Sequence, residues 1–127
     1  WYAWALMSDT RGVVAADIPV RPRQPGTQAL VFLVGESQSS MWDTVPNHLL
    51  AVVVSKDRVT LALRSVTPFA NGEACRKQVA ALEDKDAPDS EVRATYARCW
   101  SAALDRSPGK PVLIKAAQEL VEALETR

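Results

Sequence analysis

The sequence predicts a single α+β domain over residues 1–127, in which an antiparallel sheet of about five strands is followed by three helices packed on one face. Two observations predict this fold. Apolar residues follow a strand period up to Val66 and a helical period after Pro68. Strands followed by helices are typical of the α+β class, and a chain of 127 residues can bury one hydrophobic core of its own.

The first half of the chain contains the expected strands. Alternating apolar residues, or short continuous apolar runs, are separated by segments rich in turn-forming residues. Residues 19–26 carry three prolines and form a surface connection, and Ser55–Arg58 makes a tight turn between two strands of an antiparallel hairpin. The expected strands are Trp1–Met7, Val13–Ile18, Gln28–Val34, Leu49–Val54 and Val59–Val66.

Three amphipathic helices are expected after Pro68. Apolar residues there recur every three or four positions, which places them on one side of a helix. The KDAPD sequence at residues 85–89 breaks the pattern and separates the first two helices. The three apolar stripes are Cys75, Val79 and Leu82; Val92, Tyr96, Cys99, Trp100 and Ala103; and Leu113, Ala117, Leu120, Val121 and Leu124.

The spacing of the two cysteines predicts a disulfide between Cys75 and Cys99. Each cysteine stands twelve residues from Ala87, the centre of the turn between the first two helices, so an antiparallel hairpin sets both at the same height. The same register places the apolar stripes of the two helices against each other. Such a bond indicates an oxidising compartment, whereas the alternative is a pair of buried thiols in a cytosolic protein.

Composition argues against several partners. The chain has 15 basic and 15 acidic residues and no net charge, so neither nucleic acid nor an anionic membrane surface is expected as a partner. No apolar run reaches the roughly 20 residues of a membrane span. Because the sequence begins at Trp1 without an initiator Met, we expect that a signal peptide or anchor has been removed, and that the protein is periplasmic or extracellular.

Ser37 is the residue that most resembles a catalytic nucleophile, because Gly35 ends an apolar strand two positions before it. The elbow that exposes such a serine needs a second glycine, and Ser39 occupies that position. The chain has one histidine, His48, as a candidate base and as a candidate metal ligand. We therefore expect no enzyme, no catalytic residue, no metal and no cofactor, and we keep a small serine esterase using Ser37 as an alternative.

The polar loop between the two central strands is the expected binding site. Trp42 and Met41 stand outside either strand period, and tryptophan is enriched at protein interfaces. With Ser37 and Gln38 they form the predicted contact to another protein, although Trp42 could instead plug an open end of the sheet. We expect a noncatalytic exported binding or structural module, such as the soluble domain of a cell-envelope assembly. The alternative is an inhibitor or immunity-type protein that presents residues 35–46 to a target enzyme.

Overall fold

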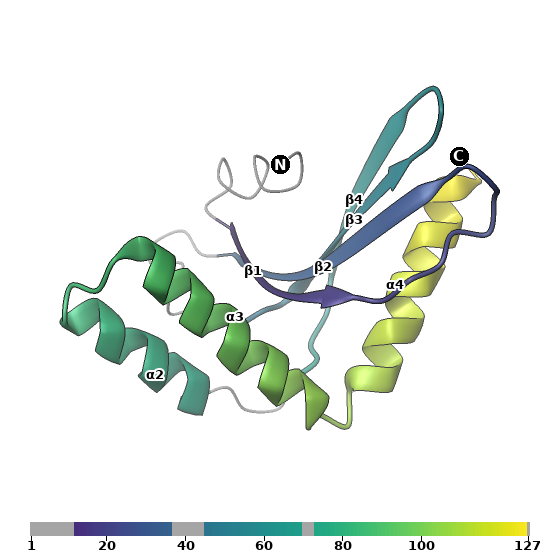
Figure 1. Ribbon diagram of the computed structural model, residues 1–127. Helices are drawn as coiled ribbons and strands as arrows, with labels where there is room; N and C mark the ends of the chain where they lie inside the picture. Colours follow the sequence, from purple (N-terminus) through teal and green to yellow (C-terminus); the bar gives the residue numbers. More distant parts are fainter. Residues whose placement is uncertain (1–11, 37–44, 70–72, 127) are drawn as a thin grey trace.

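The computed structural model describes residues 12–36, 45–69 and 73–126 as one antiparallel sheet followed by three helices (Figure 1). The α+β fold is therefore confirmed, with four strands in the described part of the chain. The fifth expected strand, Trp1–Met7, lies outside the described residues. The strands are β1 (Gly12–Ile18), β2 (Gln28–Glu36), β3 (His48–Val54) and β4 (Val59–Ser65), and the helices are α2 (Glu73–Asp84), α3 (Asp89–Asp105) and α4 (Lys110–Glu125).

The strands pair in chain order, β1-β2-β3-β4, and every neighbouring pair is antiparallel. The β3–β4 turn closes with a hydrogen bond from Ser55 N–H to the Arg58 carbonyl at 2.9 Å, which fixes the register of the hairpin. One irregularity interrupts the β1–β2 ladder. Ala15 is the extra residue of a β-bulge, because Val14 pairs with Val34 and Ala16 pairs with Leu33.

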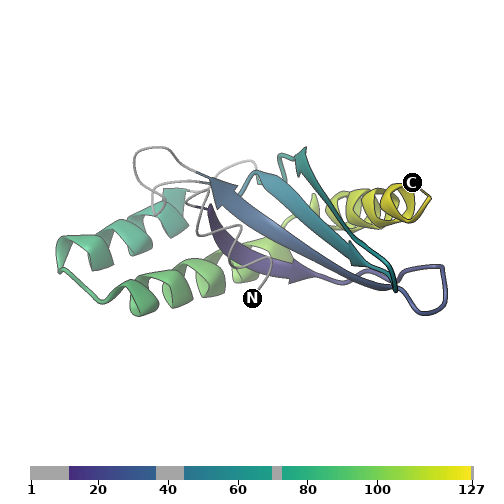
Figure 2. The same ribbon diagram turned by 90° about the horizontal axis from the view of Figure 1, so that it is seen from above.

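The three helices form one layer on one face of the sheet, as the sequence predicts, and α2 belongs to that layer through its packing on α3. The helical stripes form a single core with alternate residues of β2 and β3, including Leu33 and Leu49, which are fully buried. Helix α3 packs over β1, and α4 packs over β3 and β4, so the two helices cover different parts of the same face (Figure 2). Trp100 lies in this core against Phe69 and Tyr96, with ring centroids 4.8 and 6.1 Å away. Burial raises the pKa of the Tyr96 phenol above its ordinary value.

Helices α2 and α3 form the expected antiparallel hairpin around the KDAPD turn. Helix α2 ends when Asp86 adopts a left-handed conformation with φ of 54°, a conformation that asparagine, aspartate and glycine adopt most readily. The N–H groups of Asp86 and Ala87 then donate to the carbonyls of Glu83 and Leu82, both at 3.0 Å. Pro88 directly precedes α3, where it cannot continue the earlier helix but suits the start of a new one.

Candidate binding surface

The sheet face opposite the helices carries a second apolar cluster. We call this the outer face: it consists of side chains that alternate with those of the helix-packed core along each strand. None of the described helices contributes to this cluster. Its members are Val14, Leu30, Phe32, Val34, Leu50, Val52, Val54, Val59, Leu61 and Leu63.

The outer face has a buried centre and an exposed margin. Val34, Leu50 and Val52 at its centre are at most 5% exposed. Leu30 and Leu63 are 40% and 54% exposed, and Val59 is also exposed. Full burial of a large aliphatic side chain is favourable by about 1.5–3 kcal/mol relative to leaving it in water. An exposed side chain does not contribute this free energy. Several exposed aliphatic residues on one sheet face are therefore typical of a surface that contacts another molecule.

A chain of three polar side chains lies at one end of the outer face. His48 and Ser65 are directly opposite on β3 and β4, and Ser65 Oγ lies 3.3 Å from His48 Nε2. On the other side of the imidazole ring, His48 Nδ1 lies 2.8 Å from Asn47 Oδ1. Both ring nitrogens of His48 therefore have a polar neighbour, and the tautomer of the imidazole decides which nitrogen donates and which accepts. The order serine, histidine, asparagine is the order of a nucleophile, its base and an orienting group.

The backbone that follows Ser65 differs from that of a nucleophile elbow. In serine hydrolases with a nucleophile elbow, the N–H of the residue after the nucleophile helps to stabilise the oxyanion. Here that group is the N–H of Val66, which donates to the Asn47 carbonyl at 2.9 Å as part of the sheet ladder. The hydroxyl of Ser65 also sits on an exposed strand residue. The N–H of Val66 is therefore not free to stabilise an oxyanion at Ser65.

The four residues predicted to bind a partner, Ser37, Gln38, Met41 and Trp42, lie outside the described residues. The structure does describe both ends of their loop. Asn47 N–H donates to the Val34 carbonyl at 3.0 Å, so the chain leaves β2 and enters β3 at neighbouring positions. The predicted role of the loop in binding stays a prediction.

The disulfide between Cys75 and Cys99 is confirmed. The bond joins α2 to α3, with the two Cα atoms 5.8 Å apart. Cys75 is buried in the helix-packed core, and Cys99 packs against it. The bond therefore joins the two helices of the hairpin, and its cysteines lie in the core on the opposite side of the sheet from the outer face.

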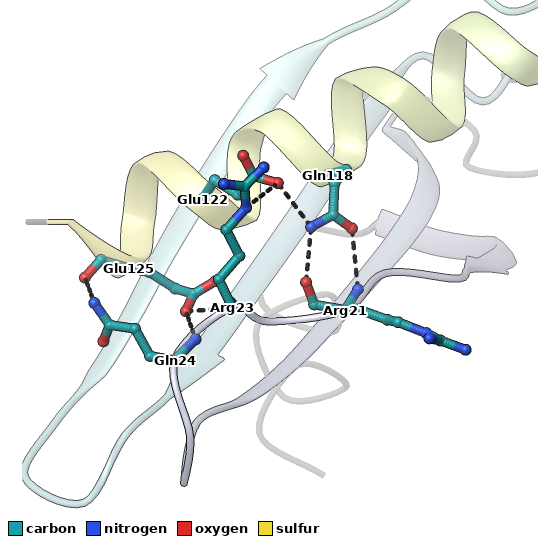
Figure 3. Close-up of polar contacts among 6 residues, drawn as sticks. All are labelled: Arg21, Arg23, Gln24, Gln118, Glu122 and Glu125. Atoms are coloured by element: carbon teal, nitrogen blue, oxygen red, sulfur yellow. Dashed lines mark hydrogen bonds and ion pairs between the residues drawn. The ribbon is translucent and has the colours of Figure 1, made fainter.

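The proline-rich connection between β1 and β2 is held by the last helix (Figure 3). The carboxamide of Gln118 accepts from Arg21 N–H at 3.0 Å and donates to the Arg21 carbonyl at 2.7 Å, as a neighbouring strand would. The carboxylate of Glu125, which is buried, accepts from the N–H groups of Arg23 and Gln24, each at 2.9 Å. We call these contacts the loop clamp.

Arg21 and Arg23 of this connection carry the kind of charged group that an anion-binding site would use. Arg23 Nε pairs with Glu122 Oε2 at 3.2 Å on a largely exposed part of the surface. The side chain of Arg21 points away from α4 in Figure 3. An anion site would bring both guanidinium groups to one place. The two side chains diverge, so the arrangement favours a structural role for this loop.

A surface cavity of about 340 Å³ lies between the end of β4 and the first turns of α4. Its wall is fixed by Ser107, whose hydroxyl donates to the Pro68 carbonyl at 2.7 Å. Gly109 approaches the same carbonyl so closely that a Cβ atom would lie 3.0 Å from the oxygen. The lining is mainly aliphatic, with one charged residue. It consists of Arg64, Ser65, Val66, Thr67, Pro68, Gly109, Val112, Leu113 and Ala116.

Comparisons with protein-family models, curated proteins and solved structures give no match. Within residues 12–36, 45–69 and 73–126, no group of three or more histidine, cysteine, aspartate or glutamate side chains is placed to hold a metal ion. In the same part of the chain, no helix is long and apolar enough to cross a membrane. Among the described features, the outer face therefore gives the best support for a proposal of function.

Sequence reasoning missed two features of this surface. The Ser65–His48 contact could have been predicted from the turn at Ser55–Arg58. This turn pairs Val54 with Val59, and counting back along both strands then pairs His48 with Ser65. The apolar outer face had a weaker signal. The continuous apolar runs of β2 and β3 indicate strands that are buried on both faces, whereas the described helices cover one face only.

Proposed function

We propose that the protein is a noncatalytic exported binding module that docks another protein on the outer face of its sheet. The observation that carries the proposal is the exposed aliphatic margin of the outer face, which consists of Leu30, Val59 and Leu63. A partner that covers Leu30 and Leu63 removes their apolar surface from water, which is favourable.

Export is supported by the disulfide between Cys75 and Cys99. Disulfides persist in the periplasm and outside cells, and they are rare in the cytosol, where thiols are kept reduced. The partner of a module in such a compartment is an envelope or extracellular protein. The docking surface is apolar, and the chain as a whole has no net charge. Both properties suit a protein partner better than a polyanion such as nucleic acid.

The test compares two substitutions that introduce the same charge at exposed aliphatic residues. Leu30→Lys places the charge on the outer face, whereas Val112→Lys places it on α4, where Val112 is 72% exposed. The tagged protein and both variants are used to capture partners from the envelope fraction of the source cell. The affinity of the purified partner is then measured by calorimetry.

Leu30→Lys is expected to weaken binding by about 2 kcal/mol, the scale of an interface hot spot, and Val112→Lys is expected to leave binding unchanged. Circular dichroism of both variants checks that the fold is intact. Equal affinity for all three proteins, or a loss confined to Val112→Lys, would contradict docking on the outer face.

A further inference from the structure

The edge of the sheet formed by β4 has unpaired backbone groups that point outward. The bonds from Ser55 to Arg58 and from Val66 to Asn47 show which β4 residues face β3. Antiparallel ladders alternate, so the even-numbered residues of β4 bond to β3 and the odd-numbered ones face away. No described residue bonds to the outward N–H and C=O groups, which belong to Val59, Leu61, Leu63 and Ser65.

The two edges of the sheet differ in how they are protected. Strand β1, at the other edge, carries the bulge at Ala15 and is followed directly by Pro19, and α3 packs over it. Bulges and prolines are features by which proteins prevent unwanted strand pairing. Strand β4 pairs with β3 over its seven residues without a bulge or a proline. The β4 edge is therefore regular enough to accept a further strand.

We propose that the β4 edge pairs with the β4 edge of a second copy of this chain, in antiparallel orientation about a two-fold axis at Ala62. In this register Leu61 of one copy lies opposite Leu63 of the other, and Val59 lies opposite Ser65. These are the residues with outward backbone groups, so each forms a hydrogen-bonded pair. The two sheets join into one, and a two-fold interface buries the same residues from both copies.

Charge selects this register over its neighbour. An axis at Leu61 would place Arg58 directly opposite Arg64 of the second copy, and like charges in that position are destabilising. With the axis at Ala62, Arg64 lies opposite Thr60 instead, and the pairing spans the strand from Val59 to Ser65. The apolar outer-face residues of both copies then lie in adjacent rows, which extends the outer face across the dimer.

The first test is the oligomeric state of the purified protein, measured by sedimentation velocity over a range of concentrations. Leu63→Pro removes an outward N–H, which an edge strand tolerates, and should raise the dimer dissociation constant at least about tenfold. Leu63→Lys leaves the backbone intact and serves as a second variant. Leu30→Lys, on the outer face of β2, should leave the dimer intact.

A monomer at all concentrations would overturn the proposal. Dimers that survive both Leu63 variants, or that Leu30→Lys disrupts, would overturn it as well, because they would show association through another surface. Thermal unfolding of each variant checks that the monomer fold is retained. The partner protein takes no part in this experiment, so its result is independent of the proposed function.

The second test reads the register directly. Both native cysteines are joined to each other, so an introduced cysteine is the sole thiol. Ala62→Cys should form an intermolecular disulfide under mild oxidation, because the residue lies opposite itself across the axis in a non-hydrogen-bonded pair. Thr60→Cys, on the same face of β4, should remain reduced, since its counterpart lies about 13 Å along the strand. Cross-linking of Thr60→Cys in preference to Ala62→Cys would contradict this register.

Discussion

Replacement of Glu125 by Gln is expected to lower the free energy of unfolding by about 2 kcal/mol. The Glu125 carboxylate accepts from Arg23 N–H at 2.9 and 3.1 Å and from Gln24 N–H at 2.9 Å. A hydrogen bond to a charged group contributes about 1.5–3 kcal/mol, and a carboxamide keeps one acceptor oxygen for the two donors.

One opposing effect reduces this cost. A negative charge in the last turn of a helix interacts unfavourably with the helix dipole, by about 0.3–1 kcal/mol, and Glu125 lies in the last turn of α4. Neutralising the carboxylate removes that repulsion. The loss of a charged acceptor exceeds the gain, which leaves the net destabilisation near 2 kcal/mol.

Urea denaturation of the wild type and Glu125→Gln measures the difference. Glu119→Gln is the matched control, because Glu119 is an exposed residue of the same helix and has no polar partner among the described residues. Hydrogen exchange at the amides of Arg23 and Gln24 should accelerate in Glu125→Gln alone. A destabilisation below about 0.5 kcal/mol, or unchanged exchange at these amides, would refute the role assigned to the carboxylate.

Replacing Cys75 and Cys99 by serine is expected to lower the free energy of unfolding by about 3 kcal/mol, because the bond closes a loop over a sequence separation of 24 residues. Chemical denaturation without reductant measures this difference, and a loss below about 1 kcal/mol would contradict the prediction. Hydrolysis of activated esters is expected to stay at the buffer rate in the wild type, since Val66 N–H is engaged in the sheet; turnover that disappears in Ser65→Ala or Ser37→Ala would contradict a noncatalytic role.

The parts of the fold that sequence reasoning predicted depend on local signals. The turn at Ser55–Arg58 fixes the β3–β4 register, and the helix break at residues 85–89 fixes the height of Cys75 against Cys99. In both cases a short connection converts residue spacing directly into a spatial relation, so counting residues from the turn is enough.

The loop clamp could not be predicted in the same way. Gln118 and Arg21 are 97 residues apart, and neither spacing nor periodicity indicates which helix reaches the proline-rich loop. The sequence around Glu125 is even misleading, because an acidic residue at a helix C-terminus is intrinsically unfavourable. The backbone donors that compensate for it are known only once the tertiary arrangement is known.

The loop clamp also has a consequence for the order in which the chain can fold. It connects the segment between the first two described strands to the last described helix, across 97 to 102 residues. A growing chain presents its N-terminal segments first, so the proline-rich loop has no helix to bind until α4 has been synthesised. Contacts of such large sequence separation form late, since closing the loop between them costs entropy. The nascent sheet therefore lacks the support of the loop clamp until the last described helix has been synthesised.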